Sequence, residues 1–242
     1  MCNQDKPVVN LTGFDIYSDS KENCLKEVFS KSKVHVVSGN PEVLYTALQD
    51  EVLGSAFRDD STLIIPDGVG TRVAAKLKGL KITEKIAGVE FMIDIISRCE
   101  EEGKSIYLLG TNDKSLNACI NSLKSKFNNL IIAGSHNGYF DANNSDEIIN
   151  DIKNSSPDAL FVAMGCPRQE RFILSYMDIL PTKIFMGVGG SFDVIGGIKK
   201  RAPKIIVSLG LEWLYRVIKE PFRIKRLNVI PKYIFKAIRY KK

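Results

Sequence analysis

Residues 61–70 read STLIIPDGVG and place an acidic side chain, Asp67, in a glycine-containing turn after a short apolar run. A helical pattern, TRVAAKLKG, begins directly after the turn. A carboxylate in such a turn can cap the following helix, because it accepts hydrogen bonds from the first N–H groups. It can also act as a general base that removes a proton from a hydroxyl group. The local sequence leaves both roles open for Asp67.

Few other residues offer nucleophilic, metal or cofactor chemistry. Of the two histidines, His35 alternates with valines in a strand-like run, which favours a structural role. The five cysteines are odd in number and include no Cys-x-x-Cys pair, which argues against a disulfide framework and a zinc site. The glycine-rich turn GVGG at residues 187–190 does not match the dinucleotide-binding pattern Gly-x-Gly-x-x-Gly, which disfavours a dehydrogenase. We therefore predict neither a metal ion nor a cofactor.

If Asp67 is a general base, a negatively charged leaving group nearby would need cationic side chains to neutralise its charge, and the sequence contains no Asp-x-Asp to hold a divalent ion. Arg216, Arg223 and Arg226 recur at roughly helical spacing and could fill this role; salt bridges or lipid contacts are the alternatives. Gln169, within PRQE, is a neutral amide that could read a base or a sugar amide. Its alternative role is an ordinary surface position at a helix start.

These residues lie in a chain whose strand-like runs alternate with helical runs. The strand-like runs are rich in apolar and β-branched residues and end in glycine-containing turns, which is typical of a mostly parallel, Rossmann-like α/β sheet with helices on both faces. Ligands of such sheets bind beyond the carboxyl ends of the strands. Residues 8–16 are expected to form one short strand and residues 21–30 a helix. The later strand and helix pairs are 33–39 with 41–53, 62–68 with 71–79, 105–111 with 114–127, 130–140 with 145–156, and 159–167 with 168–180, and 183–197 ends the series.

The net charge of +6 is unevenly distributed. Residues 199–242 hold 14 Lys and Arg residues and two acidic residues, a net charge of +12, which leaves −6 on residues 1–198. We therefore predict an α/β body over residues 1–198 and a basic helical C-terminal appendage over residues 199–242. Residues 1–13 lack the layout of a secretory signal, and no apolar run approaches the roughly 20 residues of a membrane span, so we expect a cytoplasmic protein.

The last helical pattern of the appendage is amphipathic. Its apolar face combines five residues: Ile230, Tyr233, Ile234, Ala237 and Ile238. Three bases occupy the other face: Lys232, Lys236 and Arg239. This layout predicts a helix lying on an anionic membrane surface. A surface helix whose apolar stripe covers the core has the same pattern. A basic segment can also bind nucleic acid, but the apolar stripe between the charges favours lipid.

Several ordered motifs between about residue 40 and residue 226 resemble those of the WecG/TagA/CpsF glycosyltransferases. PDGVG resembles the D-G-x-G motif of that family, and EKIAGVEFM resembles its E-R-x-x-G stretch. The remaining motifs are GNPE after Ser38 for a T-x-N turn, GYF, MGCPRQE, GVGGSFDVIGG, RAP and LEWLYRVIKEPFRIKR. The candidate site residues that these motifs supply are Ser38, Asn40, Asp67, Gly68, Gly70, Lys85, Gly165, Gln169, Gly189, Arg216, Arg223 and Arg226.

The resemblance implies an inverting, metal-independent enzyme that moves an N-acetylmannosamine-type sugar from a UDP donor to GlcNAc-diphospho-undecaprenol, as in the synthesis of wall teichoic acid or a related surface glycan. It implies that Asp67 is the catalytic base. It also implies that the basic appendage closes the active site and holds the enzyme at the inner face of the cell membrane. Neither nucleic acid nor a cofactor is an expected partner, and a homo-oligomer stays open.

Three positions depart from the family pattern. Lys85 replaces an arginine, which keeps a positive charge near a diphosphate but loses the bidentate fork of a guanidinium group. Ser38 replaces a threonine and Glu90 an aspartate, and both keep the functional group. The donor sugar stays open between N-acetylmannosamine and a uronic acid or glucose type. From other protein classes, a nucleic-acid-binding protein and a non-catalytic membrane adaptor are the alternatives.

Overall fold

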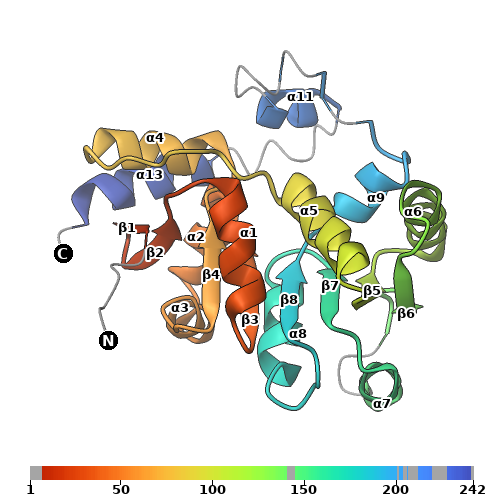
Figure 1. Cartoon of the computed structure of the whole chain (residues 1–242). Helices are drawn as coiled ribbons and strands as arrows, with labels where there is room; N and C mark the ends of the chain where they lie inside the picture. The colour runs from red at the N-terminus through yellow and green to blue at the C-terminus, as the bar shows by residue number, and fades with distance from the viewer. Residues whose placement is uncertain are drawn as a thin grey trace. The chain divides into compact units, whose positions relative to one another are not determined.

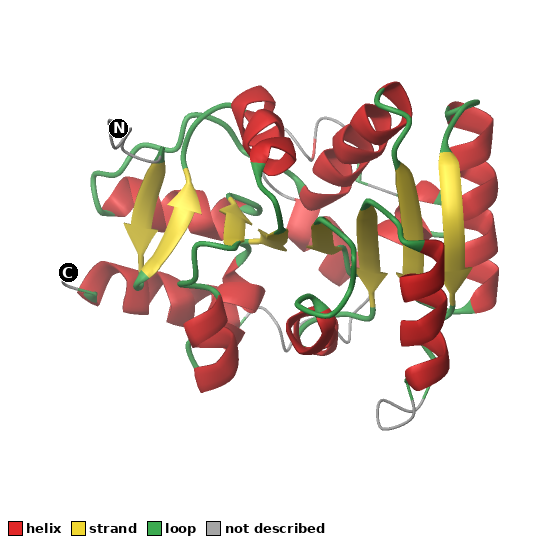
Figure 2. Ribbon diagram, turned by 60° about the horizontal axis from the view of Figure 1, so that its bottom comes forward, coloured by secondary structure: helices red, strands yellow, loops and turns green. Residues whose placement is uncertain are grey.

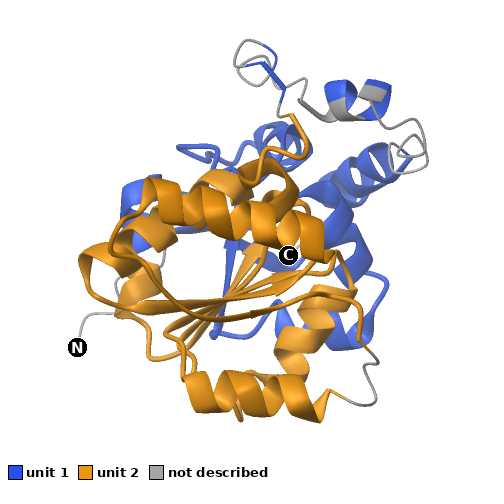
Figure 3. Cartoon of the chain, turned by 90° about the vertical axis from the view of Figure 1, so that its right-hand side faces the viewer, with its two compact units in different colours: residues 1–26, 38–87, 202–242 blue, residues 27–37, 88–201 orange. Residues whose placement is uncertain are grey.

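The computed structural model describes residues 7–140, 145–200, 202–203, 206, 212–219 and 228–240. The chain divides into two compact units, shown in Figure 3. Unit 1 comprises Met1–Lys26, Ser38–Ala87 and Ala202–Lys242, and unit 2 comprises Glu27–Val37 and Gly88–Arg201. The sequence predicts a different division, into a body over residues 1–198 and an appendage over residues 199–242 that closes the active site and associates with the membrane. That division of roles stays a prediction.

Unit 2 is built on five parallel strands in the order β3-β8-β7-β5-β6. Its strands are β3 (Val34–Ser38, the last residue of which belongs to unit 1), β5 (Ser105–Gly110), β6 (Ile131–His136), β7 (Ala159–Ala163) and β8 (Ile184–Gly187). Its helices are α5 (Gly88–Glu101), α6 (Asp113–Lys126), α7 (Asp146–Ser155), α8 (Arg168–Tyr176) and α9 (Ser191–Ile195). α1 (Lys21–Ser30) spans a unit boundary. The mostly parallel sheet that the sequence predicts is confirmed.

Helices cover both faces of the strands, as Figure 2 shows. One face packs against α7 and α8 through a cluster that includes Tyr107, Leu160 and Phe185 from the strands and Ile152 and Ile173 from the helices. α5 contacts β5, and α6 and α5 both contact α9. Because the inner strands β5, β7 and β8 are buried on both faces, their sequences read as nearly continuous apolar runs, whereas β6 at the edge of the sheet is only partly buried.

Unit 1 contains the strands β1 (Val8–Leu11), β2 (Phe14–Tyr17) and β4 (Thr62–Ile65), in the order β1-β2-β4. β1 and β2 are antiparallel, and β2 and β4 are parallel. Its helices are α2 (Pro41–Ala47), α3 (Glu51–Ala56), α4 (Val69–Leu77), α11 (Glu212–Lys219) and α13 (Val229–Arg239). α13 packs against both α2 and α4 (Figure 1).

Two predicted elements of unit 1 are wrong in detail. Residues 8–16 form a hairpin instead of one strand, because Thr12 and Gly13 turn the chain with φ angles of 58° and 84°. A positive φ at a threonine is uncommon, so the sequence gives little sign of this turn. Residues 41–53 form two helices instead of one, since the Asp50 side chain accepts hydrogen bonds from Val52 N (3.1 Å) and Leu53 N (3.2 Å) and begins α3.

The apolar stripe of the C-terminal helix covers protein instead of facing lipid. Tyr233 and Ala237 of α13 are fully buried, and Ile230 and Ile234 are half-buried. Ile238, which the sequence places on the same face, is exposed. The prediction that these five residues face a membrane is therefore wrong for Tyr233 and Ala237, because α2 and α4 offer them an apolar surface within unit 1.

His35 is fully buried in β3, as its structural interpretation requires. Burial lowers the pKa of His35 to about 3, well below its ordinary value. In the unfolded chain this histidine gains a proton near pH 6.5, whereas the folded protein does not. The free energy of unfolding therefore falls as the pH drops below about 6.5, by about 1.4 kcal/mol per pH unit, because only the unfolded chain takes up this proton.

We expect the free energy of unfolding, measured with urea between pH 7 and pH 4, to fall less steeply in His35→Leu than in the wild type. The comparison of slopes removes the contribution of carboxylates that titrate in both proteins. Equal slopes in the two proteins would contradict a neutral buried histidine.

Candidate functional site

Asp67 follows the carboxyl end of β4 and lies two residues before the first residue of α4. The turn is closed by a hydrogen bond from Asp67 N to Ile65 O (2.8 Å). The N-cap position of α4 is Gly68, which has no side chain and a φ of 78°. Asp67 is thus one residue ahead of the cap position, and it is half-buried. Asp67 is therefore not the N-cap residue of α4, and its role as general base stays a prediction.

Ser38 is the last residue of β3, and Asn40 lies in the neighbouring turn that follows this strand. The Asn40 side chain caps α2, since its Oδ1 accepts hydrogen bonds from Glu42 N and Val43 N (both 3.1 Å). Its Nδ2 donates to Ser38 O (3.4 Å). The oxygen of Asn40 therefore organises the turn, and any contact of Asn40 with a substrate stays a prediction.

Two bonds tie this turn to the Asp67 turn. Gly39 N donates to Ile65 O (2.9 Å), and the buried hydroxyl of Thr71 in α4 donates to Gly39 O (2.6 Å). A Cβ on Gly70 would lie only 2.5 Å from Pro41 Cγ, so the start of α4 can lie this close to α2 only with glycine there. The Asn40 and Asp67 turns are therefore held together as one rigid feature of unit 1.

Lys85, which lies further along the chain, is held next to the Asp67 turn. Ile86 N donates to Pro66 O (3.2 Å), so Lys85 and Asp67 are the chain neighbours of two hydrogen-bonded residues. Lys85 is half-buried, whereas Lys81 is exposed. The predicted site residues Ser38, Asn40, Asp67, Gly68, Gly70 and Lys85 thus gather in unit 1. A carboxylate with a lysine nearby suits proton removal beside a negatively charged group.

A second cluster, in unit 2, centres on Gln169. Its Oε1 accepts hydrogen bonds from Gly165 N (3.0 Å) and Gly189 N (2.9 Å). Its Nε2 donates to Glu170 Oε1 (2.7 Å). The amide thereby links the turn after β7 to the turn after β8, both at the carboxyl ends of strands. The three predicted residues Gly165, Gln169 and Gly189 are brought together.

Gln169 is only 4% exposed, so the alternative of an ordinary surface position is wrong. Its oxygen is used by two backbone N–H groups, which gives the side chain a positioning role. A contact of its amide with a base or a sugar stays a prediction. Glu170, which is 2% exposed, completes this arrangement, and the sequence analysis did not single it out because an acidic residue near a helix start is usually exposed.

Gln169→Ala is expected to lower the free energy of unfolding by about 1–3 kcal/mol, since it removes the shared acceptor of two backbone N–H groups. Urea unfolding would measure the change. Gln49→Ala is the matched control, because Gln49 is exposed and should change stability little. Equal stability of the two variants would contradict the positioning role.

The predicted arginines of the appendage are not placed. Arg216 belongs to α11, but its side chain lies outside the described residues, as do Arg223 and Arg226 entirely. Their contact with a diphosphate stays a prediction.

Sequence reasoning also passed over Tyr139, noted only as part of the GYF motif. This residue follows β6 and is 77% exposed. An exposed aromatic ring beyond the carboxyl end of a strand offers a flat face for a base or a sugar. Only its exposure in the structure identifies Tyr139 as a candidate binding residue, because the sequence does not distinguish an exposed tyrosine from a buried one.

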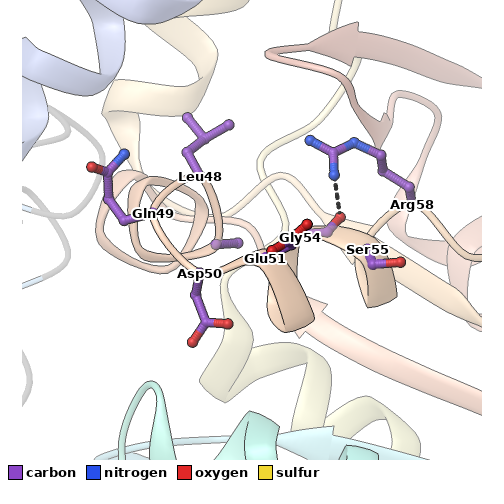
Figure 4. Close-up of a pocket in the computed structure, with 8 residues that line it drawn as sticks. Leu48, Gln49, Asp50, Glu51, Gly54, Ser55 and Arg58 are labelled. Atoms are coloured by element: carbon purple, nitrogen blue, oxygen red, sulfur yellow. Dashed lines mark hydrogen bonds between the residues drawn. The ribbon is translucent and has the colours of Figure 1, made fainter.

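An open depression of about 520 Å³ lies elsewhere in unit 1, between α2 and α3 (Figure 4). Its lining includes Gln49, Asp50, Glu51 and Arg58. The Arg58 Nη1 atom donates to Gly54 O (2.6 Å), and the guanidinium group stacks over Phe14. None of the predicted site residues lines this depression, so we do not assign the chemistry to it.

Other reactive groups are limited among the described residues. No group of three or more His, Cys, Asp and Glu side chains in the described ranges could hold a metal ion. Burial raises the pKa of Cys99 and of Cys119 to about 12, which keeps both thiols protonated and unreactive. Within that same part of the chain, none of the helices has the length and apolar character needed to span a bilayer.

Comparisons with known proteins agree with the motifs. The model of the "Glycosyl transferase WecG/TagA/CpsF family" matches residues 9–242. A protein of Bacillus subtilis (strain 168) is 33% identical over 96% of this chain and 88% of its own length. A protein of Bacillus spizizenii is 32% identical over 99% and 93%, and one of Staphylococcus aureus (strain MW2) is 30% identical over 88% and 83%. All three are named N-acetylglucosaminyldiphosphoundecaprenol N-acetyl-beta-D-mannosaminyltransferase.

Proposed function

Because the chain belongs to the WecG/TagA/CpsF family of glycosyltransferases, we propose that it transfers N-acetylmannosamine from a UDP donor to GlcNAc-diphospho-undecaprenol. The observation that carries this proposal is the match over residues 9–242, together with relatives of one shared name that align with nearly the whole chain. The product would serve the synthesis of wall teichoic acid or a related surface glycan.

The proposed reaction is a single displacement with inversion at the anomeric carbon. Asp67 takes the proton of the acceptor hydroxyl as the oxygen forms its bond to the sugar. The bond between the sugar and UDP breaks in the same step, and its electron pair leaves with the diphosphate. The half-buried position of Asp67 at the end of β4 supports this role, because ligands of parallel sheets bind at that end.

Cationic side chains would stabilise the departing diphosphate without a metal ion. Lys85 is the first candidate, because the hydrogen bond between Ile86 and Pro66 holds its backbone beside the Asp67 turn. A lysine acts here as a point charge and lacks the two parallel hydrogen bonds of an arginine. Arg216, Arg223 and Arg226 are proposed to share the role.

We also propose that the basic C-terminal region keeps the enzyme at the inner face of the membrane. The lipid-linked acceptor resides there, and the net charge of +12 over residues 199–242 attracts anionic headgroups.

The test is a transfer assay with a short-chain GlcNAc-diphospho-lipid and a panel of UDP-sugars, with and without a chelator, read by mass spectrometry. We expect the acceptor to gain the mass of one N-acetylhexosamine from UDP-N-acetylmannosamine, at the same rate with chelator. A gain only from a uronic acid or glucose donor would instead assign the alternative donor. Loss of activity with chelator would overturn metal independence, and absence of any product would overturn the function.

A further inference from the structure

The segment that follows α4 carries Lys85 and contains neither helix nor strand over residues 80–87. It passes the start of α1, as Figure 1 shows. A segment without a helix or a sheet ladder has its position set by individual hydrogen bonds and by the burial of individual side chains. The contacts on either side of Lys85 therefore limit where its ammonium group can reach.

On the side that follows Lys85, the segment is anchored by Ile86. Its N–H group donates to Pro66 O (3.2 Å), and its side chain is fully buried. Pro66 directly follows β4. This side of the segment is therefore fixed to the turn that contains Asp67.

On the side that precedes Lys85, two contacts fix the segment to another part of unit 1. Thr83 N donates to Ser18 O (2.8 Å), directly after β2. The carboxylate of Glu84 accepts a hydrogen bond from Lys21 N through its Oε2 atom (2.8 Å). Lys21 is the first residue of α1, so its N–H group is one of the four at a helix start that have no partner within the helix.

Glu84 complements the cap that α1 receives from its own sequence. The Ser20 hydroxyl accepts a hydrogen bond from Asn23 N (3.3 Å), which leaves Lys21 N to the carboxylate of Glu84. The partial positive charge at a helix N-terminus also attracts a carboxylate. A side chain 63 residues further along the chain therefore ties the start of α1 to the segment that carries Lys85.

We propose that Glu84 is a positioning residue for sugar transfer: by binding the first N–H group of α1, it holds Lys85 beside the Asp67 turn. The inference rests on the proposed function, which gives Lys85 its role at the departing diphosphate. Glu84 is negatively charged, so a direct contact with a diphosphate would be repulsive, and its contribution passes through the backbone to Lys85. This role accounts for the glutamate of the EKIAGVEFM motif, which the sequence alone leaves without one.

Asp50 supplies the matched control, because it makes the same kind of contact elsewhere in unit 1. Its Oδ1 accepts hydrogen bonds from Val52 N (3.1 Å) and Leu53 N (3.2 Å) at the start of α3. None of the predicted site residues belongs to α3. Loss of a contact at a helix start destabilises the fold in either place, so Glu84→Ala and Asp50→Ala should both lower the urea midpoint. Only the positioning role makes the two variants differ in sugar transfer.

The first test is a double-mutant cycle on kcat with the short-chain lipid acceptor. We expect Glu84→Ala to lower kcat by about tenfold or more, because a misplaced charge stabilises the leaving group poorly. In a Lys85→Ala background, the same substitution should cost less than about twofold, the usual scatter of independent effects. Asp50→Ala should keep the wild-type kcat. Glu84→Gln should keep most of it, because an amide oxygen can also accept the hydrogen bond from Lys21 N.

Three kinetic results would overturn the proposal. The first is a wild-type kcat in Glu84→Ala. The second is an equal loss from Glu84→Ala with and without Lys85, which would show an effect that does not pass through the lysine. The third is an equal loss in Asp50→Ala, which would show a general effect of destabilising a helix start.

A second test, amide hydrogen exchange, reports the anchoring without any sugar transfer. The N–H groups of Thr83 and Ile86 are hydrogen-bonded, so exchange at both should become severalfold faster in Glu84→Ala if the carboxylate holds this segment. Asp50→Ala should instead affect exchange at the start of α3. Unchanged exchange at Thr83 and Ile86 in Glu84→Ala would contradict the anchoring.

The two tests together separate this inference from the proposed function. Faster exchange at residues 83–86 in Glu84→Ala, without sugar transfer by the wild type, would overturn the function and leave only the anchoring by Glu84. Sugar transfer by the wild type, with the same kcat and the same exchange in Glu84→Ala, would overturn the positioning role and keep the function.

Discussion

Asp67→Asn is expected to lower the rate of sugar transfer by about 10²–10⁴-fold while leaving the fold intact, because an amide of the same size cannot accept the acceptor proton. The measurement is kcat with saturating UDP-sugar and a short-chain lipid acceptor. Binding of UDP, measured by calorimetry, should change little, since the base acts on the acceptor.

Asp60→Asn is the matched control, because Asp60 is an exposed aspartate just before β4, whereas Asp67 follows the same strand. This control should keep the wild-type rate. Near-normal turnover by Asp67→Asn would show that another group removes the proton. A similar loss in both variants would point to a general effect of charge.

Tyr233→Ala is expected to lower the free energy of unfolding by about 3–5 kcal/mol, the range for removing a large aromatic side chain from a well-packed core. Tyr233 is fully buried where α13 packs against α2 and α4. Urea unfolding followed by circular dichroism would measure the loss.

Phe235→Ala is the control on the same helix. Phe235 is an aromatic residue of similar size that is exposed, so its removal should change stability in solution by less than about 0.5 kcal/mol. Equal losses in both variants would contradict the packing of α13 on unit 1. Because α13 buries Tyr233, a truncation after Ile198 should also destabilise unit 1.

Local sequence signals predicted the features that depend on a few adjacent residues. The alternation of apolar runs with amphipathic segments predicted the parallel strands, since that pattern reflects burial on both faces. The turn at Asp67 could be identified because glycine and an acid follow a strand directly. The hairpin at Thr12 and the break between α2 and α3 escaped notice, because a positive φ at threonine and a cap at Asp50 carry weaker signals.

Packing decided the roles of individual side chains. The motif PRQE marked Gln169, but only the fold shows its oxygen joining Gly165 and Gly189. Lys85 and Asp67 are distant in sequence, and the bond between Ile86 and Pro66 brings their backbones together.

The amino-acid sequence was enough to predict the α/β class, the resemblance to a family and the residues that could carry the chemistry, because each depends on residue type and spacing along the chain. Which face of α13 is buried, in contrast, is seen only in the folded chain. Burial of an apolar stripe lowers the free energy whether the stripe packs against protein or against lipid, so its periodicity cannot distinguish the two environments. The surface that α2 and α4 present to Tyr233, assembled from separate parts of the chain, makes that distinction.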